Sequence, residues 1–177
     1  TAPTVGMPTT FMFAAGSCAR ADTDKVPTQP AFKALEAISP DFFLFVGDNV
    51  YFDPLANGEI TNVSGARSFY REALQRTFSW ASPTHEARAD FGRDSRATFF
   101  AHTPMWGVWD DHDFLHDNSY GVSFGVPDPN RIWARQVFME YWPNGRYGDG
   151  TDGIYSRFSW GDVDVFLVDG RYFRDID

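Results

Sequence analysis

The chain has 177 residues, of which 43% are hydrophobic and 18% aromatic, and its formal net charge is −9. This composition supports one folded domain with a sizeable, aromatic-rich core. The negative charge argues against a nucleic-acid backbone or an anionic membrane as the main partner. No stretch reaches the roughly 18 apolar residues that a transmembrane helix needs. The single cysteine, Cys18, excludes an internal disulfide.

The first third of the chain predicts a strand, a helix and a second strand. Residues 11–15 form a short apolar run that ends at a glycine, which indicates a buried strand. Apolar residues then recur at helical spacing over residues 32–38, and residues 42–46 form a second apolar run. This order predicts parallel strands joined by a crossover helix.

The remaining elements follow the same reasoning. Residues 65–102 have an interrupted helical pattern, and residues 105–109 are the third strand candidate. A polar loop is expected over residues 114–129 and another helix over residues 131–142. Two strand-like runs within residues 154–168, separated by a glycine and an aspartate, predict a β-hairpin.

Polar residues suited to metal binding follow each of the three strands that precede the hairpin. Cys18 follows the first strand, Asp48 the second and Asp111 the third. Ligand sites in open α/β sheets lie beyond the carboxyl ends of the strands. If the strands are neighbours, these three residues converge in space although they are far apart in the sequence.

The segment after the second strand, residues 47–51 (GDNVY), combines a carboxylate with a phenol. Asp48 could bridge two metal ions with its two oxygens, and Tyr51 could return as a phenolate ligand. A phenolate and the Cys18 thiolate together favour a ferric ion, whereas softness alone also allows Zn²⁺. The alternative is an ordinary turn in which Tyr51 packs against its neighbours.

The segment after the third strand, residues 109–113 (WDDHD), places three carboxylates around one imidazole. Their mutual repulsion is costly unless a cation is present. Asp111 is therefore the expected metal ligand and His112 the expected donor or acid. Asp110 or Asp113 would orient the imidazole. The alternative is a solvated acidic loop.

Taken in order, the segments 13–18 (FAAGSC), 47–51 (GDNVY) and 109–113 (WDDHD) resemble the alkaline phosphatase D (PhoD-like) family of metallophosphatases. Residues 164–174 (DVFLVDGRYFR) resemble that family's strand ending in DTRxxR, with Gly170 in place of the threonine. The resemblance extends over nearly the whole chain.

This resemblance implies an α/β (α+β) fold, a metallophosphatase-like sandwich of two sheets flanked by helices. Residues 1–177 would be the N-terminal half of the catalytic domain. The implied activity is metal-dependent hydrolysis of phosphate monoesters or diesters. The implied location is secreted or periplasmic, and the start of the chain is compatible with a processed terminus.

The resemblance also implies a site with Fe³⁺ and Ca²⁺. Cys18, Asp48 and Tyr51 would carry the iron. Asp48 would bridge to calcium, Asp111 would bind calcium, and Asn118 is a further candidate ligand. From the chemistry of the ligands, Zn²⁺ remains an alternative metal.

The resemblance also implies that His112 is the catalytic imidazole of this chain. Arg131 would face the phosphate, although an arginine on a helix is also commonly exposed to solvent. Asp169, Arg171 and Arg174 favour a structural ion-pair cluster over a catalytic role.

Members of the family continue well beyond the point that corresponds to Asp177. We therefore expect a separate or nicked polypeptide to carry the C-terminal half, with further metal ligands. Without that half, a sheet edge and an apolar face should be uncovered, and the chain should be inactive or poorly soluble. Two alternatives remain open: a non-catalytic metal-binding or assembly subunit, and another chemistry such as that of a zinc hydrolase.

Overall fold

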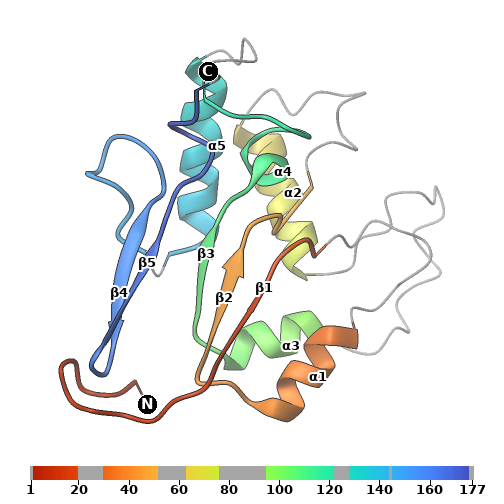
Figure 1. Cartoon of the computed structure of the whole chain (residues 1–177). Helices are drawn as coiled ribbons and strands as arrows, with labels where there is room; N and C mark the ends of the chain where they lie inside the picture. The colour runs from red at the N-terminus through yellow and green to blue at the C-terminus, as the bar shows by residue number, and fades with distance from the viewer. Residues whose placement is uncertain are drawn as a thin grey trace, which may run out of the picture.

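In the part of the chain that the structure describes, a parallel and an antiparallel sheet pack together with several helices (Figure 1). The computed structural model describes residues 2–19, 30–51, 63–75, 95–121, 128–143 and 145–175. The elements are β1 (Phe13–Gly16), α1 (Pro30–Ile38), β2 (Phe42–Val46), α2 (Val63–Gln75), α3 (Ser95–His102), β3 (Met105–Val108), α4 (Asp111–Phe114), α5 (Asp128–Tyr141), β4 (Ser156–Trp160) and β5 (Val163–Leu167).

The three-stranded sheet has the order β1-β2-β3, and all its strands are parallel, as the sequence predicts. The central strand β2 has the predicted bounds and is buried over four of its five residues. The register pairs Phe13 with Phe42, and Val46 with Val108. The carboxyl ends of the three strands therefore meet at one edge of the sheet, at the top of Figure 1.

Aromatic side chains on opposite faces of β2 join the sheet to both neighbouring layers. On one face, Phe43 lies 5.4 Å from the ring centre of Phe99 in α3. On the other face, Phe42 lies 5.0 Å from the ring centre of Trp160 in β4. Each such aromatic pair stabilises the fold by about 0.5–1.5 kcal/mol beyond the contribution of the apolar area that it buries. They place the β4–β5 hairpin and the helices on opposite sides of the parallel sheet.

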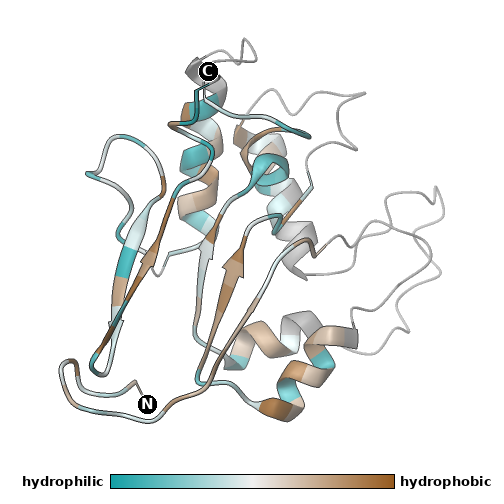
Figure 2. Cartoon of the chain, in the orientation of Figure 1, coloured by the Kyte–Doolittle hydropathy of each residue, from teal (hydrophilic) through white to brown (hydrophobic). Residues whose placement is uncertain are grey.

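The hairpin is confirmed, with β4 and β5 antiparallel and Ser156 opposite Leu167. Its outer side exposes two large apolar side chains, Phe166 and Val168, which retain 66% and 76% of their accessible surface. Figure 2 shows the hydrophobic colouring along β5. The uncovered apolar face expected from the sequence stays a prediction.

The helices agree with the sequence in place but differ in bounds. The interrupted pattern over residues 65–102 corresponds to α2 and α3, and the segment between them lies outside the described residues. The last predicted helix begins earlier, as α5. The short helix α4 precedes the expected polar loop, in the segment after β3, where the sequence did not predict a helix. Among the helices described, none has the length and apolarity needed to cross a bilayer.

Candidate metal centre

Backbone hydrogen bonds continue past the strands and bring their polar ends together. The N–H of Cys18 donates to the Gly47 carbonyl at 3.2 Å, and the N–H of Ala19 donates to the Asp48 carbonyl at 3.1 Å. The side chain of Asn49 donates to the carbonyl of Val108, at the end of β3, at 3.0 Å. The loops after β1, β2 and β3 are therefore held in a fixed relation.

Asp48 lies at the centre of the cluster and is buried, with 7% of its surface accessible. Its Oδ2 atom is 3.4 Å from the Cys18 sulfur and accepts a hydrogen bond from the Tyr51 hydroxyl at 3.2 Å. Its Oδ1 atom is buried and has no hydrogen-bond partner among the residues that the structure describes. A buried carboxylate oxygen without a partner is costly, so this atom fits a metal ligand whose cation completes the site.

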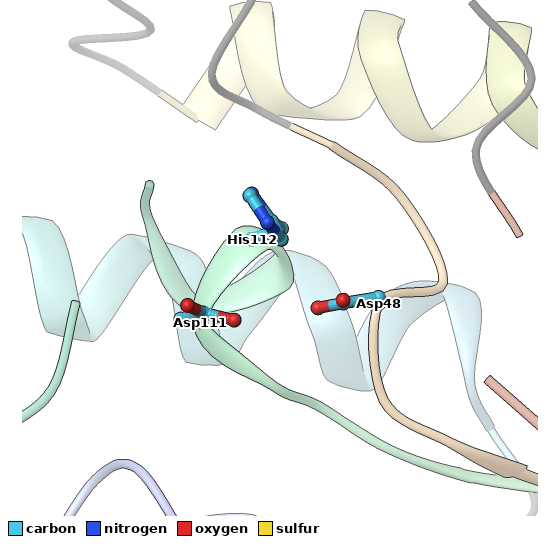
Figure 3. A group of neighbouring side chains, drawn as sticks. All are labelled: Asp48, Asp111 and His112. Carbon is cyan, nitrogen blue, oxygen red and sulfur yellow. The ribbon is translucent and has the colours of Figure 1, made fainter. Parts of the chain in front are cut away.

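Asp111 and His112 both lie in α4, and Figure 3 shows the carboxylates of Asp48 and Asp111 facing each other with the His112 ring to one side of them. One potential ligand atom from each of Asp48, Asp111 and His112 lies within 4.8 Å of the other two, although Asp48 follows β2 and the other two residues follow β3. The His112 ring also lies 4.4 Å from the ring centre of Tyr51. The donor set therefore combines a thiol, a phenol, two carboxylates and an imidazole, which suits transition metals and calcium.

The Asp111 carboxylate is oriented by the loop that follows α4. Its Oδ2 atom accepts a hydrogen bond from the backbone N–H of Asn118 at 2.6 Å. Its own carbonyl accepts one from the Ser119 hydroxyl at 2.8 Å. Asn118 itself has a positive φ of 60°, and its side-chain amide donates to Asp117.

The cluster is electrostatically unfavourable for anions when no cation is present. Burial raises the pKa of Asp48, and the charges of Asp110 and Asp111 add to this, while contacts with Cys18 and His112 oppose it. Burial also raises the pKa of the Tyr51 phenol, and the Asp48 carboxylate strengthens this shift. A bound cation reverses both effects, because it favours the ionised forms.

Asp113 is fully buried and fastens α4 to the loop after β2. It accepts hydrogen bonds from the N–H groups of Val50 at 2.9 Å and Asp110 at 3.0 Å. Burial raises the pKa of this carboxyl to about 7, and the two N–H groups partly offset that shift. Asp113 thus holds the polypeptide on both sides of the cluster.

We expect Asp113→Asn to lower the free energy of unfolding by about 1–3 kcal/mol, the cost of leaving one buried donor without an acceptor. An amide can accept only one of the two N–H bonds and presents its own NH₂ group to the other. Urea unfolding of the metal-free chain measures this loss. The matched control is Asp162→Asn in the exposed turn of the hairpin, and equal stability of the two variants would contradict the assigned role.

Arg171 joins the cluster from the segment after β5, a role that the sequence did not predict. Its guanidinium pairs with Asp110, and its Nη2 atom lies 3.6 Å from Asp111 Oδ1. Among the described residues, the ion pairs of Arg171 are with Asp110 and Asp111, whereas Asp169 accepts its backbone N–H. The sequence shows only that Arg171 follows a predicted strand. Its partners depend on how the hairpin packs on the parallel sheet.

The predicted site residues fall into two groups. Cys18, Asp48, Tyr51, Asp111 and His112 lie together, and the backbone of Asn118 contacts this group.

Arg131 lies on α5, where its guanidinium carbon is 5.1 Å from the ring centre of Tyr172, and its contact with phosphate remains a prediction. The two aspartates expected to orient His112 have other partners. Asp110 pairs with Arg171, and Asp113 accepts two backbone N–H groups.

Fold and cluster together define an α/β protein with a candidate metal centre at the carboxyl ends of its parallel strands. A family model described as PhoD-like phosphatase matches residues 13–177, and the chain belongs to this PhoD-like phosphatase family. A solved structure titled "Structure of PhoD" has 22% sequence identity and a TM-score of 0.69 to this chain. That likeness shows a shared fold.

The similarity covers 99% of this chain but only 34% of the solved PhoD chain. The chain therefore spans about a third of the length of that protein. No curated protein matches it.

Proposed function

We propose that this chain is the N-terminal part of a metal-dependent phosphoesterase that hydrolyses phosphate monoesters or diesters. The observation that carries the proposal is the convergence of the Cys18, Tyr51 and Asp111 side chains around the buried carboxylate of Asp48. These residues come from three separate strand ends, and the site that they form has an unpartnered carboxylate oxygen at its centre. Membership of the PhoD-like phosphatase family supports the same reaction class.

The proposed metals are Fe³⁺ and Ca²⁺. Cys18, Asp48 and Tyr51 would hold the iron, because a thiolate and a phenolate favour the more acidic cation. Asp48 and Asp111 would hold calcium, with Asn118 as a further candidate, because oxygen ligands suit this hard cation. Asp48 fits the bridging position, since Oδ2 contacts the thiol and the phenol while Oδ1 has no protein partner. Zn²⁺ is the alternative to iron.

Metal ions in such a site polarise a phosphoryl oxygen and activate a water molecule. The protein residues would position the substrate and move the proton. His112 is partly exposed beside the cluster, with 17% of its side-chain surface accessible, and can donate a proton to the departing oxygen. Arg131 is proposed to bind the phosphate on the family resemblance. No covalent enzyme intermediate is required.

We further propose that the rest of the catalytic domain, in the same or a separate polypeptide, completes the sandwich and the site. The chain corresponds to 34% of the solved PhoD chain, which supports this proposal. The exposed side chains of Phe166 and Val168 on the hairpin give the completing part an apolar surface on which to pack. A secreted or periplasmic location is proposed from the family resemblance alone.

Tyr51→Phe tests the iron assignment. The wild-type chain loaded with Fe³⁺ should show a visible charge-transfer absorption from the phenolate, and the variant should lose it while remaining folded. Tyr155→Phe, on an exposed tyrosine before β4, is the control and should keep the colour. An unchanged absorption in Tyr51→Phe would remove this residue from the iron site. Elemental analysis that found only zinc would favour the zinc alternative.

A further inference from the structure

The side chain of Arg171 crosses from the end of the hairpin to the end of β3. Its Nε atom donates a hydrogen bond to Asp110 Oδ1, and its Nη2 atom lies 3.6 Å from Asp111 Oδ1. Its Nη1 atom is 3.5 Å from the carbonyl of Ser119, in the loop after α4. The side chains of Arg171 and Asp111 are only 14% and 10% exposed, so solvent screens this pair weakly, whereas the Asp110 side chain is 43% exposed.

The backbone that carries Arg171 is itself fixed. The Asp169 carboxylate accepts hydrogen bonds from the N–H groups of Arg171 and Tyr172, both at 2.9 Å. The same oxygen accepts the indole N–H of Trp109 at 2.8 Å. Trp109 immediately precedes Asp110 in the sequence. Asp169 therefore connects the backbone that carries Arg171 to Trp109, the residue before the carboxylates that Arg171 contacts.

Arg171 contacts the two adjacent carboxylates in different ways. Asp110 is engaged by Nε, whereas Asp111 keeps one oxygen on the Asn118 N–H and turns the other toward Nη2 at a distance longer than a hydrogen bond. Asp111 thus stays close to Asp48 and His112, within the group of candidate metal ligands, and Asp110 is not part of that group among the described residues.

We propose that Arg171 is a positioning residue of the calcium site. It holds Asp110 away from the metal and keeps Asp111 in the orientation that receives it. This inference rests on the proposed function, because it assigns calcium to Asp111. The planar fork of arginine suits the task, since it can contact two carboxylates and a carbonyl at once.

The direction in which Ca²⁺ affinity changes when Arg171 is removed distinguishes positioning from a simple effect of charge. If Arg171 acted only as a nearby positive charge, it would repel Ca²⁺, and its removal would strengthen metal binding. If it positions Asp111, its removal weakens binding. Residues that orient metal ligands typically contribute a factor of about 10–100 to metal affinity.

Calorimetric titration of the full chain with CaCl₂ measures this change in Ca²⁺ affinity. We expect Arg171→Met to weaken Ca²⁺ binding by about 10–100-fold, and Arg171→Lys to recover only part of the loss because lysine lacks the fork. Arg157→Met on the outer face of β4 removes the same charge away from the cluster and should bind like the wild type. Binding by Arg171→Met that equals or exceeds that of the control would overturn the proposal.

A double-mutant cycle shows whether Arg171 acts through Asp110. Asp110→Asn should weaken Ca²⁺ binding, and its combination with Arg171→Met should cost less than the sum of the two single losses. Additive losses would contradict a shared contact. Because Asp110→Asn itself removes a negative charge that attracts Ca²⁺, Arg171→Lys, which keeps the positive charge but lacks the fork, is the test variant if Arg171→Met does not fold.

A metal-free measurement distinguishes failure of this inference from failure of the proposed function. In the apo chain, the Asn118 amide donates to Asp111 Oδ2, so its hydrogen exchange reports the orientation of that carboxylate. Exchange should accelerate in Arg171→Met and not in Arg157→Met, and equal exchange rates would overturn the positioning role. A wild-type chain that binds no Ca²⁺ would refute the calcium assignment, and with it the proposal as stated.

Discussion

Asp48→Asn is expected to abolish binding of both metals. The amide keeps the size of the carboxylate and can still contact Cys18 and Tyr51, but it has no charge and cannot bridge two cations with two anionic oxygens. Asp48 has a positive φ of 52°, a conformation that asparagine tolerates well, so the variant should fold. Metal content after loading with Fe³⁺ and Ca²⁺ and desalting measures the effect.

Asp164→Asn is the matched control, because this residue lies exposed on β5, outside the cluster. It should retain wild-type amounts of both metals. If Asp48→Asn retained iron and calcium to the same extent, the carboxylate would not bridge the two ions, and the assignment of the centre would fail. Circular dichroism of both variants verifies that a loss of metal does not follow from a loss of fold.

In the metal-loaded protein that includes the completing part of the catalytic domain, His112→Asn is expected to lower kcat by about 10²–10⁴-fold, the usual contribution of a general acid. The metal content should remain unchanged, because the remaining ligands hold both ions in the proposed arrangement. Hydrolysis of an aryl phosphate monoester and of the corresponding diester measures kcat. The loss should be smaller for a substrate with a more acidic leaving group, since such a group departs without a proton.

The geometry also allows His112 to bind metal directly, because one of its ring nitrogens lies within 4.8 Å of the Asp48 and Asp111 oxygens. The His112→Asn variant separates the two roles. A loss of iron or calcium in parallel with activity would make His112 a ligand and would contradict its assignment as the acid. His102→Asn at the exposed end of α3 is the control for the loss of an imidazole.

The strands and their polar ends were predictable because short apolar runs that stop at glycine or aspartate are a local signal. The run at residues 42–46 became β2 with the same bounds, and the expected hairpin formed. Parallel pairing then brought Cys18, Asp48 and Asp111 to one edge of the sheet. The general rule on ligand sites in α/β sheets therefore placed the site without any knowledge of side-chain contacts.

Two features of the site depended on contacts that the sequence does not encode locally. The helix α4 has only four residues, too few for a periodic pattern, and Asp113 fastens it by accepting the N–H groups of Asp110 and Val50. The partners of Arg171 depend on how the hairpin packs on the parallel sheet, which places the end of β5 beside the end of β3. From the sequence, Arg171 was expected to form a structural ion-pair cluster with Asp169 and Arg174 instead.

The most direct test of the metal centre is a pair of anomalous-scattering maps, collected at and below the iron absorption edge from crystals loaded with Fe³⁺ and Ca²⁺. We predict an iron peak bounded by Cys18 Sγ, Tyr51 Oη and an oxygen of Asp48. A second peak, for calcium, should lie between Asp48 and Asp111. Well-ordered crystals in which this cluster holds no metal, or in which the iron is bound elsewhere, would contradict the account.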